Sequence, residues 1–255
     1  ELLAAFGLPS RLYPEVQPCQ EVIGGLNAEA AAELGLPAGI PVIAGGEDTS
    51  SAGLALGAVR PGMAFLSLGT AGTLYATEPR PRVHPQLLTF AHVLEHQFLV
   101  GGSMGAIGAA LAWLRTALGD QEDLAALLDL ASGANPGADN LIFLPYLNGE
   151  LQPINDGYAR GVFFGLGMHT GKAELVRAVL EGAAYAIAQN LEYAELLSGH
   201  IQEVRATGGP TRSALWCQII ADVCNRPLNV LADEGGAPLG NALLAGSAVG
   251  LIADL

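Results

Sequence analysis

Three apolar, strand-like runs are each followed directly by a glycine-rich turn, and this pattern limits the fold more than any other feature of the sequence. The runs and turns are PVIA with GGED at 41–48, FLSL with GTAG at 65–72, and EVRAT with GGPTRS at 203–213. Helical patterns alternate with such strands, and the longest helix is expected over 172–197. This alternation predicts an α/β fold.

Glycine-rich turns of this kind can present backbone N–H groups to a phosphate, because glycine lets the main chain approach a ligand closely and adopt positive φ. None of them is a Walker A sequence or a G-x-G-x-x-G that opens a βαβ unit, so P-loop and Rossmann folds are excluded. Turn chemistry alone explains each turn taken singly. Whether these turns bind phosphate or are only structural turns must therefore be judged from the order of all the motifs along the chain.

The chain is acidic, with 11 Lys and Arg residues against 25 Asp and Glu residues and a formal net charge of -14. This balance argues against nucleic acid or an anionic membrane as a partner. An anionic ligand must then be held by local groups, and the 34 glycines offer many accessible backbone N–H groups.

The longest uncharged run, Gly235–Ala253, approaches the length of a membrane span. It carries Pro238, Asn241 and repeated Gly and Ala, and it lacks the sustained Leu, Ile and Phe content that insertion favours. We expect a buried helix here, and we expect no signal peptide at the start of the chain.

The cysteines and histidines predict neither disulfides nor a metal site. Cys19, Cys217 and Cys224 are odd in number and contain no C-x-x-C pair, which suits a reducing cytoplasm. The last two share one face of an expected helix, where core packing explains them. His92 and His96 are spaced like a helical zinc pair, but their segment alternates like a strand and has no third ligand nearby.

The segment around GTAG is expected to form a hairpin, because β-rich runs flank a glycine turn. Further helices are expected over 27–34, after residue 48, and over 103–118, 121–130 and 212–224, with strands over 41–44, near 87–100 and in NLIFLPYL at 140–147. Thr49, Ser50 and Ser51 are the expected caps of the helix after residue 48. The composition shifts at Arg60–Gly62, which predicts a domain boundary.

Glu47 and Asp48 are adjacent acids in a chain with few charges. Neighbouring side chains on an extended segment point to opposite faces, so these two carboxylates cannot easily converge on one substrate atom. A hydrolase with paired carboxylates is disfavoured for this reason. One of the two acids is expected to be the working group.

An ordered series of motifs covers nearly the whole chain from about Val22 onward. The motifs are AGGEDTSSAGLALGAVRPG, FLSLGTAGTLYATE, GGSMGAIGAALAWLR, LPYLNGELQPINDGYARGVFFGL, LVRAVLEGAAYAI, ATGGPTRSALWCQIIADV and GAPLGNALLAG. Together they resemble the carboxy-terminal half of the FGGY carbohydrate kinases, above all the xylulokinase branch. The resemblance implies a ribonuclease H-like, actin-like ATPase fold with a mixed sheet flanked by helices, and a cleft that closes over a sugar and ATP with Mg2+.

The resemblance also assigns the acidic loop. Asp48 matches the general base that accepts the proton of the attacking sugar hydroxyl during in-line transfer of the γ-phosphoryl group. Thr49 matches a position that touches the substrate. Glu47 is read as a solvent-facing or sugar-specificity residue. The alternative for Asp48 is a helix cap that binds backbone N–H groups.

The residues that the resemblance assigns to ATP are Gly69, Thr70, Gly108, Gly208, Gly209, Pro210 and Ser213. The first two would contact the phosphates, and Gly108 either approaches the ribose and phosphates or makes a close helix contact. The two glycines of GGP would let the chain pass close to the nucleotide. The proline would face the purine, and the serine would lie at the adenine edge.

We expect three further residues to have structural roles. Arg160 is the tempting cation near the cleft, but we assign it mainly to an ion pair with Asp156. Glu181 and Trp113 are expected to be packing or helix-surface residues.

The resemblance divides the chain into 1–61, the end of a first domain that carries the catalytic acid, and 62–255, a nucleotide-binding domain. A D-x-G-T-[ST] segment, whose acid helps place Mg2+ in this family, does not occur, so we expect a truncated form. The parent would phosphorylate xylulose or a related ketose or polyol, while the fragment would bind nucleotide weakly and be inactive. Exposed apolar surface would favour self-association, such as a homodimer. The alternative is a non-catalytic, actin-like nucleotide-binding or interaction module.

Overall fold

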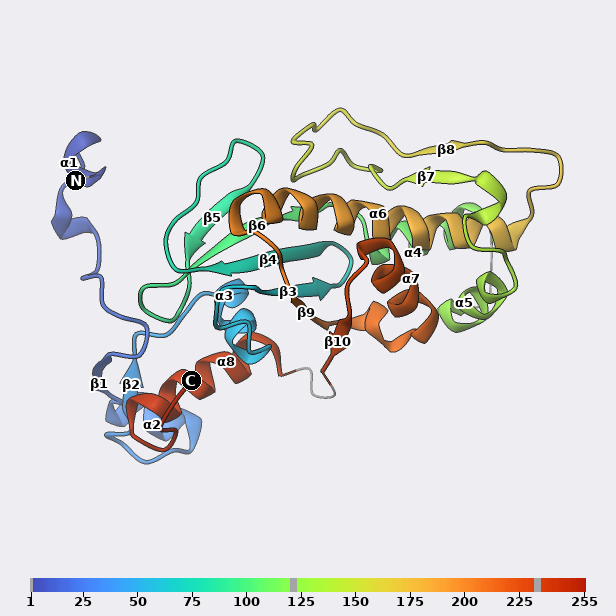
Figure 1. Ribbon diagram of the computed structural model, residues 1–255. Coiled ribbons are helices and arrows are strands. Elements are labelled where there is room, and N and C mark those ends of the chain that lie inside the picture. Colours follow the sequence, from blue (N-terminus) through green and yellow to red (C-terminus); the bar gives the residue numbers. More distant parts are fainter. Residues whose placement is uncertain (1, 120–122, 232–234) are drawn as a thin grey trace.

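A six-stranded mixed sheet forms the centre of the computed structural model, which describes residues 2–119, 123–231 and 235–255. Its strand order is β10-β9-β3-β4-β6-β5 (Figure 1). The strands are β3 Met63–Leu68, β4 Gly72–Glu78, β5 Leu88–Ala91, β6 Phe98–Met104, β9 Glu203–Thr207 and β10 Leu228–Val230. The pairs β10·β9 and β9·β3 are parallel and the others antiparallel, which confirms the expected mixed sheet.

The expected GTAG hairpin is the turn between β3 and β4, whose register pairs Leu68 with Gly72. On its other side β3 runs parallel to β9, with Ser67 opposite Thr207. Because parallel strands end at the same edge of a sheet, the GTAG turn and the GGPTRS turn lie next to each other. The sheet therefore brings together two turns that are far apart in the sequence.

Helices cover the face of the sheet on which α6 lies (Figure 1). They are α4 Gly108–Ala117, α5 Leu124–Ser132, α6 Lys172–Ser198 and α7 Ala214–Cys224. Side chains alternate between the two faces along the central strands, as the period of two requires. Leu66 and Leu74 join the large core under these helices, whereas Phe65 and Tyr75 join a smaller core with Leu56 on the opposite face.

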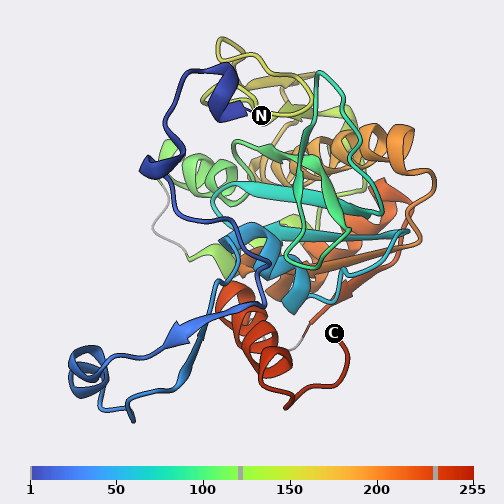
Figure 2. The same ribbon diagram turned by 90° about the vertical axis from the view of Figure 1, so that its left-hand side faces the viewer.

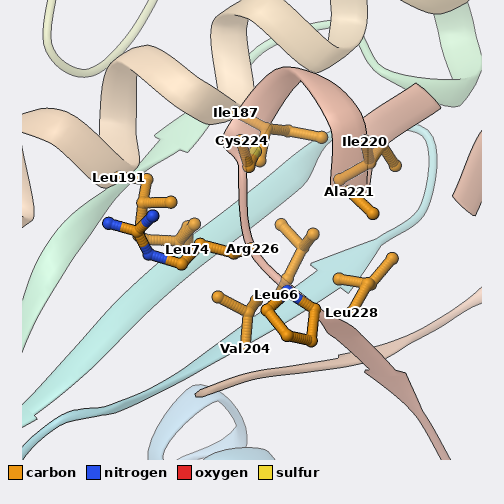
Figure 3. A pocket seen from close by; sticks show the side chains of 11 residues that line it. Leu66, Leu74, Ile187, Leu191, Val204, Ile220, Ala221, Cys224, Arg226 and Leu228 are labelled. Atoms are coloured by element: carbon orange, nitrogen blue, oxygen red, sulfur yellow. The ribbon is translucent and has the colours of Figure 1, made fainter. Parts of the chain in front are cut away.

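The large core is closely packed. A small gap between the sheet, α6 and α7 is lined mostly by apolar side chains that include Leu66, Leu74 and Ile187 (Figure 3). The gap measures about 10 Å³, which is at the limit for one water molecule. It is therefore a packing defect and offers no room for a ligand.

The expected helices 103–118 and 121–130 begin later than predicted. Strand β6 continues to Met104, so α4 starts at Gly108. Residues 121 and 122 of the second helix lie outside the described residues, and α5 follows the N-cap Asp123. Boundaries shift in this way because glycine and small apolar residues suit both element types near a strand end.

The amino-terminal segment projects from the sheet (Figure 2). It comprises α1 Leu2–Ala5, a 3-10 turn Ser10–Leu12, β1 Val22–Gly25, α2 Ala28–Leu34 and β2 Pro41–Ile43. The two strands pair only with each other, and Val42 and Ile23 are exposed. The strand predicted over 41–44 is present as β2, but its predicted burial was wrong, because an isolated two-stranded ribbon leaves most of its side chains in solvent.

Helix α3 Asp48–Ala55 packs against α8 Gly236–Ala248 on the face of the sheet opposite α6. The two helices touch at Gly240, where an added Cβ would lie 1.9 Å from the Ser51 carbonyl oxygen. In α8 only Gly240 and Leu244 are buried and the other residues are half-buried or exposed, so the expected buried helix is only partly buried. Among the helices that the structure describes, none is both long and apolar enough for a membrane crossing.

A two-stranded ribbon of β7 Ile142–Leu144 and β8 Val162–Phe164 lies beside α6. The expected strand in NLIFLPYL is therefore present, but only its middle residue, Phe143, is buried. That ring stacks on the indole of Trp113, with 6.1 Å between ring centroids and 14° between planes. Trp113 is itself exposed, so it is a helix-surface residue that also packs on Phe143, which agrees with what was expected of it.

Candidate functional site

A pocket of about 930 Å³ opens at the sheet edge where β3 and β9 end, between α4, α5 and the start of α7. This volume is at the upper end of the range for small-molecule sites. Six of the residues that the sequence assigned to ATP line it, namely Gly69, Thr70, Gly108, Gly209, Pro210 and Ser213. The fold thus brings three separate sequence motifs to one cavity.

The GTAG turn has backbone N–H groups that no described residue binds, and its Gly69 and Thr70 line this pocket. The Gly69 N–H donates to the Ala71 carbonyl at 2.8 Å, which tightens the turn. The N–H groups of Thr70 and Ala71 and the Thr70 hydroxyl form no hydrogen bond within the described residues, and both residues are exposed. Adjacent unpaired N–H groups of this kind attract anions such as phosphate.

The amino-terminal end of α4 holds the turn from behind. The Gly108 N–H donates to the Gly69 carbonyl at 2.9 Å, and the N–H groups of Ile107 and Ala109 both donate to the Thr70 carbonyl at 3.0 Å. The carbonyl groups of the turn therefore face α4 and leave its N–H groups for a ligand. An added Cβ at Gly108 would lie 2.6 Å from the Gly69 oxygen, which confirms the close helix contact. Gly108 also lines the pocket, and its approach to the ribose and phosphates stays a prediction.

The GGPTRS turn forms the opposite rim. Gly208 has φ +107, and an added Cβ would lie 1.9 Å from the Leu68 carbonyl oxygen, so only glycine fits between β9 and β3. Gly208 does not line the pocket, but Gly209 does, and nothing lies within 4 Å of its Cβ position. Ser213 caps α7, since its hydroxyl oxygen accepts the Trp216 N–H at 3.2 Å.

Helix α5 forms a wall that the sequence did not predict. Leu124, Leu128, Asp129 and Ser132 line the pocket. The two leucines lie four residues apart and so share a helix face, which was the available signal. With Pro210 they make an apolar wall suited to a flat ring, and the exposed Asp129 carboxylate can accept hydrogen bonds from hydroxyl or amino groups.

The acidic loop lies at the start of α3, and here the structure corrects the sequence analysis. Glu47 is the N-cap, and its carboxylate accepts the N–H groups of Thr49 and Ser50. The predicted caps Thr49, Ser50 and Ser51 were wrong, because the Glu47 side chain is long enough to fold back over the first turn. The cap is also not Asp48, which is the first residue of the helix.

The Asp48 carboxylate accepts the Thr49 N–H at 2.7 Å and the Thr49 hydroxyl at 3.2 Å. Hydrogen bonding with the Glu47 carboxyl group, and then with Thr49, lowers the pKa of Asp48. The side chain is exposed, so at neutral pH it is an accessible carboxylate that can accept a proton. Neither Asp48 nor Thr49 lines the 930 Å³ pocket.

The predicted ion pair between Arg160 and Asp156 was wrong. The Arg160 guanidinium donates to the carbonyl groups of Gly157 and Ala159, and the Asp156 carboxylate accepts the Tyr158 N–H at 2.7 Å. Both charged side chains therefore form hydrogen bonds with backbone groups of their own loop, which have no partners in regular secondary structure.

The structural role expected for Glu181 is confirmed. Its carboxylate is buried and accepts hydrogen bonds from the Arg177 Nε at 2.7 Å and the Gly137 N–H at 2.9 Å.

No cluster of three or more His, Cys, Asp or Glu side chains that could hold a metal occurs in the part of the chain that the structure describes. His92 and His96 lie at the turn between β5 and β6.

Models of two protein domains match the chain. The C-terminal domain of the FGGY family of carbohydrate kinases matches residues 64–249, and the N-terminal domain of that family matches residues 1–55. Xylulose kinase of Escherichia coli (strain K12) is 35% identical over 96% of the chain, which covers 51% of that relative. Gluconokinase of Bacillus subtilis (strain 168) is 28% identical over 99% of the chain, which covers 52% of it.

Solved structures agree with these matches. The xylulose kinase from Rhodospirillum rubrum superposes with a TM-score of 0.89 at 35% identity, covering 100% of this chain and 51% of that one. The ligand-bound xylulose kinase from Lactobacillus acidophilus superposes with a TM-score of 0.92 at 29% identity, covering 99% of this chain and 52% of that one. The chain spans about half the length of the relatives it matches.

Proposed function

Because this chain belongs to the FGGY family of carbohydrate kinases, we propose that it supplies the nucleotide site and the general base of an ATP-dependent sugar kinase. The observation that carries this proposal is the pocket at the sheet edge, which is lined by six of the seven residues that the family resemblance assigns to ATP. Its volume, its apolar wall and its unpaired N–H groups fit a purine nucleotide.

In the proposed reaction, a sugar hydroxyl oxygen attacks the γ-phosphorus of ATP in line, and the bond from that phosphorus to the β,γ-bridging oxygen breaks. The hydroxyl proton passes to the Asp48 carboxylate, and the products are a sugar phosphate and ADP. The lowered pKa keeps Asp48 ionised at neutral pH, which is the form that can accept the proton, although the same shift makes the carboxylate a weaker base. Thr49 would touch the sugar beside it.

The nucleotide would lie along the pocket. The N–H groups of Thr70 and Ala71 would bind its phosphates, and Pro210 with the leucines of α5 would contact the purine. Mg2+ would neutralise phosphate charge in a kinase of this type. The described residues offer no cluster of three or more His, Cys, Asp or Glu side chains that would hold it.

We propose xylulose, or a related ketose or polyol, as the sugar. The names of relatives such as the xylulose kinase of Escherichia coli support this choice. In this scheme residues 1–61 carry the base and residues 62–255 carry the nucleotide site. The 255-residue polypeptide alone is expected to bind nucleotide without phosphorylating sugar, because transfer needs both sides of a closed cleft.

The first test is calorimetric titration of the purified chain with ATP and Mg2+. Gly209→Glu would place a charged side chain in the open space of the pocket and should abolish binding, whereas Gly209→Ala should preserve it. Absence of binding by the unaltered chain, or equal binding by the Glu variant, would contradict the proposed nucleotide site.

The second test separates the kinase from a non-catalytic nucleotide-binding module. This test uses the full-length kinase that would contain the chain. There, Asp48→Asn should lower the rate of sugar-dependent ADP formation at least about 10²-fold, which is the scale of general-base catalysis. Glu47→Gln should retain far more activity, since this carboxylate caps a helix. Equal losses in the two variants would instead favour a mechanism that uses both acids.

A further inference from the structure

We propose that Asn241 is a positioning residue that fixes the backbone in front of Asp48, an inference that rests on the base role proposed above. Its Oδ1 accepts the Gly46 N–H at 2.8 Å, and its Nδ2 donates to the Gly46 carbonyl at 3.3 Å. The two residues are 195 positions apart in the sequence. Helix α8 thus holds both polar groups of a residue that lies two positions before the proposed base.

The carboxamide is suited to this contact, because it both accepts and donates. A carboxylate could accept the Gly46 N–H but could not donate to the Gly46 carbonyl, and an alanine could do neither. The Nδ2 group also lies 3.4 Å from the Ala237 carbonyl of its own helix, which orients the side chain of Asn241 toward the loop.

The loop needs such a support. Gly45 has φ +75, a conformation that glycine adopts and leaves readily. Gly46 is packed so closely that an added Cβ would lie 2.2 Å from the Val93 side chain and 2.7 Å from the Ser51 hydroxyl. The turn between β5 and β6 therefore blocks movement on one side, and Asn241 holds the backbone by its polar groups.

Helix α8 provides a rigid base for Asn241. The neighbouring Gly240 lies against the Ser51 carbonyl of α3, and Leu244 is fully buried one turn further on. Both views show α8 beside α3 (Figures 1 and 2). The position of Asn241 relative to the start of α3 is thus fixed by direct helix contact.

The Asp48 side chain has no comparable support of its own. It is exposed, and its interactions are with its two neighbours in the chain, Glu47 and Thr49. The direction of its carboxylate is therefore set by the backbone that Asn241 holds. A displacement of about 1 Å in such a group can cost on the order of 10²-fold in rate.

The decisive test measures hydrogen exchange of the Gly46 amide in the purified chain and is independent of catalysis. We expect Asn241→Ala to speed this exchange at least about tenfold, which corresponds to roughly 1.4 kcal/mol. Asn241→Asp keeps an acceptor for the amide and should preserve most of the protection. Unchanged exchange in the Ala variant would overturn the proposal.

Leu244→Val is the matched control, because it loosens the packing of α8 without removing a partner of Gly46. It should leave Gly46 exchange near the unaltered rate. If it speeds exchange as much as Asn241→Ala does, the amide reports only the general packing of α8, and the positioning role is refuted.

The second test measures kcat and the KM for ATP in the full-length kinase that would contain the chain. Asn241→Ala should lower kcat about 10- to 100-fold while the KM for ATP stays within about twofold, since the loop does not line the nucleotide pocket. An unchanged kcat despite faster Gly46 exchange would overturn the positioning role. Full activity of Asp48→Asn would refute the proposed base and with it the positioning role, even if Asn241→Ala speeds Gly46 exchange.

Discussion

Protonation of His92 should destabilise the folded chain in mild acid. The ring is 5% exposed at the end of β5, and burial lowers its pKa from 6.5 to about 4. Its Nδ1 accepts the Leu94 N–H at 3.0 Å, so the neutral ring carries its proton on Nε2. A second proton on Nδ1 would face that N–H donor and break the hydrogen bond.

The size of the effect follows from the two pKa values. Between pH 6.5 and about 4 the unfolded chain binds this proton and the folded chain does not, so the free energy of unfolding falls as the pH is lowered. Each pH unit below 6.5 contributes about 1.4 kcal/mol, which gives a loss of about 2 kcal/mol at pH 5. Above pH 6.5 the contribution of His92 is nearly constant.

The assay is urea unfolding at pH 7.5 and pH 5.0, with His92→Asn as the variant. The Asn side chain can accept the same Leu94 N–H from two residues away but does not titrate. The stability of the Asn variant relative to the unaltered chain should therefore rise by about 2 kcal/mol between the two pH values.

His96→Asn is the matched control. This residue is exposed in the same turn and has φ 60, which asparagine tolerates. It should leave the pH dependence as it is in the unaltered chain. The reasoning is refuted if His92→Asn shows the same pH dependence as the unaltered chain, or if both variants change it equally.

Three further predictions concern packing and burial. Gly240→Ala should lower the melting temperature by several degrees, because the added Cβ would collide with the backbone of α3. Gly246→Ala is the control and should lower the melting temperature less, because its Cβ would contact only the Ile252 side chain. Glu181→Ala should cost about 3 to 5 kcal/mol in urea unfolding, since it leaves Arg177 buried without its partner, and a loss below about 1 kcal/mol would contradict this. Cys224 should react more slowly with a disulfide reagent at pH 8 than the other two cysteines, because burial raises its pKa to about 12; equal rates for all three thiols would count against it.

The local elements could largely be predicted from the sequence. The hairpin at GTAG, the long helix α6 and the strand β9 follow from short-range patterns, because side-chain periodicity and glycine turns act over a few residues. The order of the motifs was also sufficient to indicate the family. The exact cap of α3 could not be predicted, because Glu47 and its neighbours were all competent acceptors and only the backbone path selects one.

The sequence by itself determined that glycine-rich turns follow three strands and that two adjacent acids precede a helix. Only the tertiary structure decided that β9 lies parallel to β3, which sets Gly208 against Leu68 and joins two distant turns in one pocket. It also decided that Asp129 faces this pocket and that Asn241 reaches Gly46. These contacts depend on how whole helices and strands pack against each other. The local conformational preferences of the residues involved do not specify which distant residues they contact.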